Sequence, residues 1–210
     1  MAKFSESLAG SAKIKNHRRS KPAKIEIRRR VLDAIGTQAV VLDAFAGTGE
    51  MHAAVWSQAA GYVGCDMEWA RDDRLAYVCD NRRVLRCLDL GRFTIFDLDA
   101  FGSPWEQAAI VTARRVVRAG ERIGLVLTEG SNLGLKMGSP PTALRYLAGV
   151  KGKPSGLGRW HDQLIDRAIA GIARRMRCTI EHRWQAQGKT GAAVRYIGLV
   201  MVGADRPRGV

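Results

Sequence analysis

One stretch near the start of the chain limits its possible folds more than any other. Residues 40–50 read VVLDAFAGTGE, and alanine-rich sequence follows. An apolar β-branched run, then an acid, two glycines and helix-forming residues are typical of a strand, a tight loop and a helix. The glycines let the backbone approach a ligand closely, and the start of the helix offers free N–H groups. We therefore predict an α/β fold with a cofactor bound at this loop.

The residues around the glycines indicate which cofactor this is. A dinucleotide fingerprint, G-x-G-x-x-G, needs a third glycine where His52 stands. Instead, Asp43 precedes Gly47 by four residues, and the pattern resembles motif I of class I S-adenosylmethionine-dependent methyltransferases. The Phe-Ala-Gly-Thr-Gly spelling is most similar to members that methylate bases in DNA or RNA. The resemblance implies that S-adenosylmethionine is bound by Asp43, Phe45, Gly47, Thr48 and Gly49. A strand-to-helix turn that uses glycine only for its geometry is the alternative.

Size and charge suit one domain with an anionic partner. The chain has 210 residues, enough for a single α/β domain with an adequate core. It carries 34 Lys and Arg against 20 Asp and Glu, a formal charge of +14. Such a surplus favours polyanions, of which nucleic acid is the obvious one, over the alternative of a generic basic protein.

Other sequence signals narrow the class of protein. There is no apolar run of membrane-spanning length and no signal-peptide core, so we expect a cytoplasmic protein that does not bind membranes. The four cysteines show no C-x-x-C spacing and the four histidines are scattered. We therefore expect reduced cysteines and no metal site. The oligomeric state is left open.

The first 23 residues are polar and strongly basic. We predict a mobile arm here that contacts phosphates, with a solvated tail as the alternative. Residues 24–210 are predicted to form the single domain. It begins with a helix at 24–35 whose arginines, Arg28, Arg29 and Arg30, are expected to face solvent.

The remaining pattern alternates strands and helices. Strands are predicted at 39–45, 62–65, 83–88, 93–96, 123–127, 178–185 and 194–203. Helices are predicted at 50–60, 70–78, 105–117, 160–175 and, shorter, 141–148. The resemblance implies a Rossmann-like class I methyltransferase sheet of seven mostly parallel strands with helices on both faces, the last strand being antiparallel. The Gly- and Pro-rich stretch 132–159 is predicted to cover the cofactor and grip the substrate.

Acidic residues follow two further predicted strands. Asp66 would stand at the carboxyl end of the second strand, where an acid can accept hydrogen bonds from ribose hydroxyls. Glu68 is the alternative for this role, and a surface turn is another. Asp89 would end the third strand, and the resemblance implies that it faces the adenine amino group of the cofactor. An ordinary turn residue is an equal alternative for Asp89.

A second cluster follows the fourth predicted strand. Asp97 and Asp99 lie two residues apart, on one face of an otherwise apolar strand. Burying carboxylates there is costly unless something binds them, although a hydrogen-bonded turn at the end of the strand is an alternative. Phe101 and a Gly-Ser-Pro turn come next, and Pro104 is suited to start a helix.

This cluster resembles motif IV of amino-methyltransferases. The spelling is closest to the Asp-Pro-Phe-Gly-Ser of the tRNA guanine-N2 dimethyltransferase family, matched here by Asp99, Phe101, Gly102 and Ser103. Ala100 stands where that family has proline. The family also has a further C-terminal domain, which we do not expect within these 210 residues.

The motif IV resemblance implies methyl transfer to an exocyclic base amine, with RNA, such as tRNA, preferred over DNA. Asp99 would accept a hydrogen bond from the amine and Phe101 would stack on the base, unless Phe101 is a core residue. Asp97 could supply the acceptor instead, and it is also expected among the residues that bind the cofactor. Two other functions remain open: methylation of DNA adenine or of protein or small-molecule amines on the same fold, and a nucleic-acid-binding module without catalysis.

Overall fold

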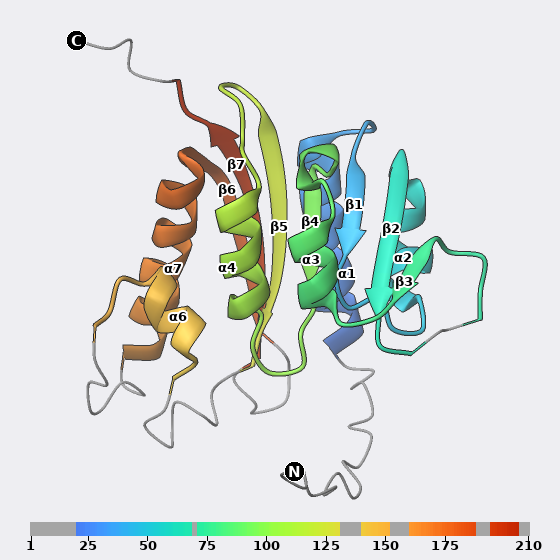
Figure 1. Cartoon of the computed structure of the whole chain (residues 1–210), viewed down its shortest axis with the longest axis horizontal. Helices are drawn as coiled ribbons and strands as arrows, with labels where there is room; N and C mark the ends of the chain where they lie inside the picture. Colours follow the sequence, from blue (N-terminus) through green and yellow to red (C-terminus); the bar gives the residue numbers. More distant parts are fainter. Residues whose placement is uncertain (1–19, 69–70, 131–139, 152–159, 188–193, 206–210) are drawn as a thin grey trace, which may run out of the picture.

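The fold is a seven-stranded sheet with helices on both faces, as the resemblance to class I methyltransferases implies (Figure 1). The computed structural model describes residues 20–68, 71–130, 140–151, 160–187 and 194–205. The strands are β1 (Val40–Asp43), β2 (Gly61–Asp66), β3 (Ala76–Val78), β4 (Ile95–Leu98), β5 (Arg122–Glu129), β6 (Cys178–Gln187) and β7 (Arg195–Gly203). Their order across the sheet is β3-β2-β1-β4-β5-β7-β6.

The expectation that the last strand is antiparallel is confirmed. Strands β1 to β5 pair in parallel, whereas β7 is antiparallel to both of its neighbours, β5 and β6. Because β1 and β4 are adjacent and parallel, their carboxyl ends meet at the same edge of the sheet. The residues that follow these two strands therefore lie together although they are far apart in the sequence.

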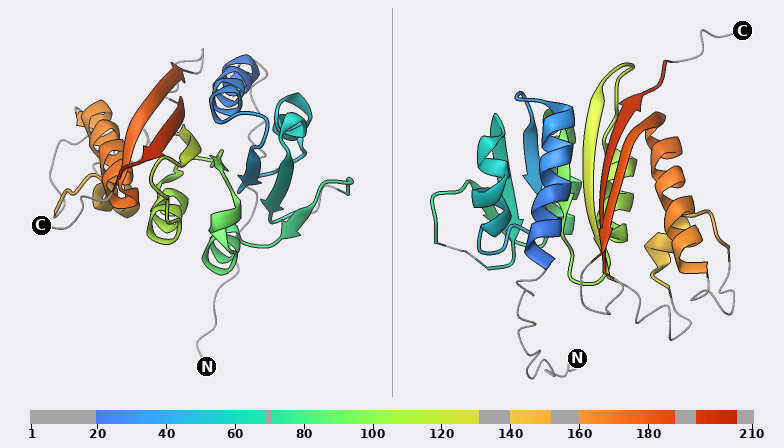
Figure 2. Two further views of the ribbon diagram at one scale, coloured as in Figure 1. Left: turned by 90° about the horizontal axis from the view of Figure 1, so that it is seen from above. Right: turned by 180° about the vertical axis from the view of Figure 1, so that it is seen from behind.

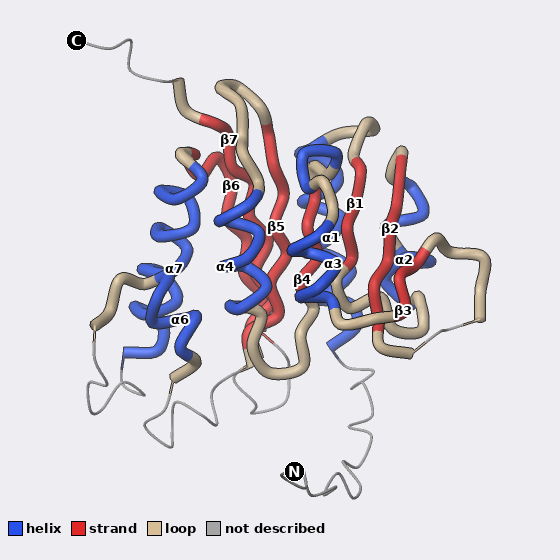
Figure 3. The backbone as a smooth tube through the Cα atoms, viewed as in Figure 1, coloured by secondary structure: helices blue, strands red, loops and turns tan. Residues whose placement is uncertain are grey.

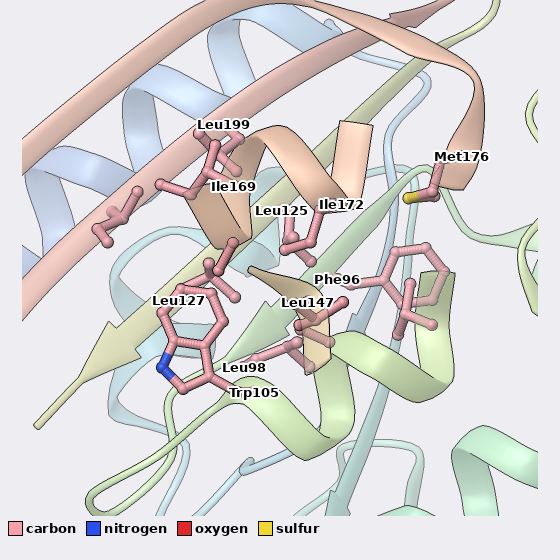
Figure 4. Packing of buried hydrophobic residues seen from close by; sticks show 14 of the residues in the cluster. Phe96, Leu98, Trp105, Leu125, Leu127, Leu147, Ile169, Ile172, Met176 and Leu199 are labelled. Atoms are coloured by element: carbon pink, nitrogen blue, oxygen red, sulfur yellow. The ribbon is translucent and has the colours of Figure 1, made fainter. Parts of the chain in front are cut away.

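Helices cover the sheet in two layers (Figures 2 and 3). One face carries α1 (Lys21–Ile35), α2 (Glu50–Ala54) and the 3-10 turn η2 (Trp56–Gln58); the other carries α3 (Asn81–Cys87), α4 (Trp105–Arg114), α6 (Thr142–Leu147) and α7 (His161–Met176). Successive side chains of a strand point to opposite faces of the sheet, so each strand contributes to both hydrophobic cores. Val41 and Ile95 pack in the core under α1, and their neighbours Leu42 and Phe96 pack in the core on the other face. Figure 4 shows the second core, where Trp105 of α4 packs among aliphatic side chains.

Two glycines bring α1 unusually close to the sheet. A Cβ atom on Gly124 of β5 would lie 2.6 Å from Cγ1 of Val31, and one on Gly198 of β7 would lie 2.9 Å from Cγ2 of the same valine. Glycine is required at both positions because any larger residue would push the helix away. The close approach sets the first turns of α1 directly over the end of β4.

The predictions for 70–78 and 83–88 are wrong. Residues 76–78 form the edge strand β3 and residues 81–87 form the helix α3. Asp80 caps that helix, because its side chain accepts a hydrogen bond from the Arg82 backbone N–H. The short strand is exposed along its length and depends on pairing with β2, so no apolar alternation identifies it.

Several boundaries also differ. The first helix begins at Lys21, because Pro22 fits the first turn of a helix, so the predicted boundary at residue 24 is three residues late. Helix α2 ends at Ala54, well before residue 60, and α4 ends at Arg114 rather than residue 117. The short helix predicted near 141–148 is confirmed as α6. Most of the basic arm (1–19) and much of the 132–159 stretch (132–139 and 152–159) lie outside the described residues.

Within the part of the chain that is described, no helix is both long and apolar enough to cross a membrane.

Candidate functional site

A pocket of about 470 Å³ opens at the carboxyl ends of β1 and β4. The predicted site residues that line it are Asp43, Phe45, Gly47, Thr48, Asp97 and Asp99. Lys21 and Lys24, from the first turn of α1, line the same pocket. The fold thus brings together the two sequence clusters that resemble motifs I and IV.

The glycine loop that leads from β1 into α2 is held from two sides. Gly47 and Gly49 have φ angles of 46° and 83°, a conformation that favours glycine. The Gly47 backbone N–H donates to Oδ2 of Asp66 over 2.8 Å, and Arg74 donates to the carbonyl oxygens of Ala46 and Gly47. Asp66 ends β2, as predicted, and its contact with Gly47 also fixes the shape of the loop. No motif pointed to Arg74, whose part in the site depends on tertiary contact.

Asp43 is buried at the end of β1. Its carboxyl group accepts hydrogen bonds from the Phe45 backbone N–H and the Tyr62 hydroxyl, both over 3.1 Å. Burial, and then the neighbouring charge of Asp97, raises the pKa of Asp43 to about 8. At neutral pH this group is largely protonated, and a bound cation would favour its ionised form.

Asp97 is part of a buried ion pair. Its oxygens accept two hydrogen bonds from Arg28, over 2.6 Å and 2.8 Å, and a third from the Trp56 indole over 2.8 Å. Both charged side chains are fully buried. The prediction that Arg28 faces solvent is wrong, because α1 directs this residue onto the acids that end β4. Although Asp97 lines the pocket, its carboxylate is committed to Arg28 and Trp56.

Asp99 lies nearer the pocket mouth and is held by two cations. Lys24 Nζ lies 3.0 Å and 2.8 Å from its two oxygens, and Arg28 Nη2 lies 3.1 Å from Oδ2. Burial raises the pKa of Asp99, but the charges of Arg28 and Lys24 outweigh it and hold the pKa below its usual value. Asp99 is therefore a stable carboxylate that can accept hydrogen bonds and is a poor base. An incoming donor would share it with Lys24 or displace Lys24.

Phe101 is 79% exposed in the loop between β4 and α4. The loop is tied to the end of β5, because the Gly130 backbone N–H donates to the carbonyl oxygen of Gly102 over 2.7 Å. Gly102 has a φ of 94°, which favours glycine there. Phe101 is thus not a core residue, and its ring is available for stacking two residues beyond Asp99.

A second pocket, of about 370 Å³, lies on the other side of Phe45. Asp66 lines it, together with Asp80, Asn81 and Gln107, and no role was predicted for these three residues. Asp80 and Asn81 follow β3, so correct assignment of that strand would have found them. Gln107, on the first turn of α4, carried no sequence signal.

The predicted position of Asp89 is wrong. This residue caps the 3-10 turn η3 (Leu90–Arg92) that precedes β4, and its side chain is 70% exposed. It therefore stands near the amino end of a strand, at the sheet edge opposite the pockets. The error follows from assigning 83–88 to a strand. Glu68, the alternative to Asp66, is exposed and donates its backbone N–H to Oδ1 of Asp66.

Two features bear on metal and redox chemistry. Among the described residues, no group of three or more His, Cys, Asp or Glu side chains could hold a metal ion. Cys65, Cys79, Cys87 and Cys178 are free thiols.

Comparison with known proteins supports the fold. No protein-family model matches the chain, and no curated protein matches it. Among solved structures, the chain is similar to Trm1 from Pyrococcus horikoshii in complex with S-adenosyl-L-methionine, with a TM-score of 0.57 and 16% identity over 87% of this chain and 56% of that one. It thus spans little more than half of that protein.

Two further structures share the architecture. The N-methyltransferase NodS from Bradyrhizobium japonicum WM9, in complex with S-adenosylhomocysteine, gives a TM-score of 0.54 at 10% identity over 91% of this chain and 90% of that one. The M. jannaschii tRNA m1G37 methyltransferase gives 0.50 at 12% identity over 90% and 51%. From the strand order, the antiparallel β7 and these similarities, we conclude that the chain has the class I S-adenosylmethionine-dependent methyltransferase fold.

Proposed function

We propose that this protein is an S-adenosylmethionine-dependent methyltransferase that acts on an exocyclic base amine of nucleic acid, with RNA preferred over DNA. The observation that carries the proposal is that the glycine loop and Asp99 line one pocket. A methyl donor held at the loop would therefore lie beside a carboxylate able to orient an acceptor amine.

The two pockets suit the two halves of this cofactor. The larger pocket, at the glycine loop and Asp43, would take the methionine half, and the pocket beyond Phe45 would take the adenosine half. Asp66 borders the loop and lines the second pocket, where one of its oxygens could also accept from a ribose hydroxyl. A cationic ligand would be favoured beside Asp43, because it stabilises the ionised carboxylate.

When bound, the cofactor would supply a methyl group on a positively charged sulfur, which an amine can displace in line. A base amine is a weak nucleophile because its lone pair is conjugated with the ring. A hydrogen bond from the amine to Asp99 would favour the geometry in which that lone pair points at the methyl group. Because its pKa is lowered, Asp99 suits the role of a hydrogen-bond acceptor rather than that of a general base. The proton lost by the nitrogen would therefore pass to solvent.

Charge and an exposed aromatic ring favour a nucleic-acid substrate. The formal charge of +14 would attract a polyanion, and Lys21 and Lys24 line the pocket where phosphates of a bound strand could lie. The exposed ring of Phe101 could stack on a base. A base inside a duplex could not reach this pocket, so the target would be unpaired or flipped out. The preference for RNA rests on the Asp99-Ala100-Phe101-Gly102-Ser103 spelling.

A labelled-donor assay tests the proposal. The protein is incubated with methyl-labelled S-adenosylmethionine and separate pools of RNA, DNA, protein and small-molecule amines. We expect label in RNA, and none there with Asp99→Ala. If label appeared only in DNA or only in the protein or small-molecule amines, the proposed substrate would be wrong, but the proposed methyl transfer would stand.

Cofactor binding is measured separately by calorimetric titration. Asp43→Ala and Asp66→Ala should each abolish binding of S-adenosylmethionine. Unchanged affinity in both variants would contradict the proposed cofactor site.

The Lys24–Asp99 pair favours one competing function, a nucleic-acid-binding module without catalysis. In the free protein Lys24 donates hydrogen bonds to both oxygens of Asp99, so the carboxylate is already occupied. The pocket could then bind nucleic acid without catalysing methyl transfer. Such a module would retain RNA or DNA with no methyl transfer to any pool, and its affinity would fall steeply with salt.

A further inference from the structure

A short chain of amides in the second pocket has a fixed direction. The carbonyl oxygen of Ala44 can only accept, so the group 2.8 Å from it on Asn81 must be the Nδ2 amide. Oδ1 of Asn81 then faces Gln107 and must accept, so Nε2 of Gln107 donates to it over 3.0 Å. Gln107 Oε1 is left at the end of the chain as an acceptor, and its amide cannot turn over without breaking this arrangement.

That oxygen is buried without a hydrogen-bond partner among the described residues. Gln107 is 9% exposed and lines the second pocket. A buried acceptor with no donor is unfavourable and calls for an explanation, and a ligand that brings an N–H group into the pocket supplies one.

The acidic side chains of the pocket are already engaged. Asp80 accepts from the backbone N–H of Arg82 over 2.8 Å and pairs with its guanidinium. Asp66 accepts from the backbone N–H groups of Gly47 and Glu68. Gln107 Oε1 therefore differs from these carboxylates in having its direction fixed and its acceptor capacity unused by the described residues.

We propose that Gln107 is the residue that selects adenine in the cofactor, its Oε1 accepting a hydrogen bond from the 6-amino group of the purine. The inference rests on the proposed function, because it takes the second pocket as the adenosine site. It moves the role first expected of Asp89 to a residue on α4. Asn81 acts as a positioning residue, since it fixes which end of the Gln107 amide faces the ligand.

The test compares two ligands that differ only at this amine. Dissociation constants are measured calorimetrically for S-adenosylhomocysteine and for its analogue with hydrogen in place of the 6-amino group. We expect the wild type to prefer the amine by about 10-fold or more, the range for one buried hydrogen bond. In Gln107→Leu the preference should fall to about 2-fold or less. The exposed neighbour Glu106, changed to Gln, is the matched control and should keep the wild-type ratio.

Two further variants separate this inference from its competitors. Asn81→Ala frees the Gln107 amide to turn its NH₂ toward the ligand, so the inosine analogue, which has an oxygen at this position, should gain affinity relative to the adenosine compound. Asp80→Asn should keep the wild-type preference. Loss of the preference in Asp80→Asn but not in Gln107→Leu would overturn the inference and assign the contact to Asp80.

The outcomes also distinguish this inference from the proposed function. If the wild-type protein binds neither ligand, the proposed cofactor site fails. If it binds both ligands equally, the cofactor site stands and the role of Gln107 is refuted. Thermal melting of each variant shows whether a lost preference reflects lost folding.

Discussion

Replacing Arg28 with Met tests the most unusual interaction of the site. Arg28 and Asp97 are both fully buried and share two hydrogen bonds, and Arg28 also contacts Asp99. Two unit charges about 4 Å apart attract by about 4 kcal/mol at an effective dielectric constant of about 20. Removing one partner of such a pair leaves a buried charge and costs about 3–5 kcal/mol. Since a domain is stable by about 5–15 kcal/mol, Arg28→Met should lose a large part of its free energy of unfolding.

Urea unfolding at neutral pH measures this loss. Arg28→Lys keeps the charge but not the paired geometry, and should lose less. Adding Asp97→Asn to Arg28→Met removes the stranded carboxylate and should restore at least about 1 kcal/mol. If Arg28→Met stays within about 1 kcal/mol of the wild type and Asp97→Asn restores nothing, the argument that these acids need a buried counter-ion is refuted.

Three further predictions concern pH, activity and packing. With the pKa of Asp43 raised by burial to about 8, against about 3.9 when unfolded, the native state holds an extra proton between these values. The free energy of unfolding should thus fall as pH rises from about 4 to 8, by up to about 1.4 kcal/mol per pH unit. Urea unfolding of Asp43→Asn should show a weaker dependence of this free energy on pH, and an equal slope would contradict the argument. Asp99→Asn should lower the methyl-transfer rate about 10²- to 10³-fold and leave affinity for S-adenosylhomocysteine within about 3-fold, and unimpaired transfer would remove Asp99 from the reaction. Gly124→Ala should cost about 1–3 kcal/mol in urea unfolding, because its Cβ would lie 2.6 Å from Val31; a neutral effect would mean that α1 can shift freely.

The glycine loop and the two strands β6 and β7 were predictable because their signals are local. A strand, two glycines and a helix follow one another within residues 40–54. Each of these segments is built from residue types that favour its backbone conformation. Pairing β6 with β7 needs only a turn between neighbouring strands. The region 70–88 failed because β3 is a short edge strand that takes its hydrogen bonds from β2 and buries none of its side chains. A strand without a buried face has no alternation of apolar and polar residues by which the sequence could predict it.

The sequence alone determined which residue types follow β1 and β4, and the resemblance to class I methyltransferases implied a sheet that would place them at one cofactor site. Only the tertiary structure decided what each carboxylate does there. Arg28 looks like one of three solvent-facing arginines, yet it is buried against an acid 69 residues away. The orientation of the Gln107 amide likewise depends on two distant residues, Ala44, which follows β1, and Asn81, on α3. Charge pairing and hydrogen-bond polarity are set by neighbours in space, and a one-dimensional pattern carries no information about distant neighbours until the sheet brings them together.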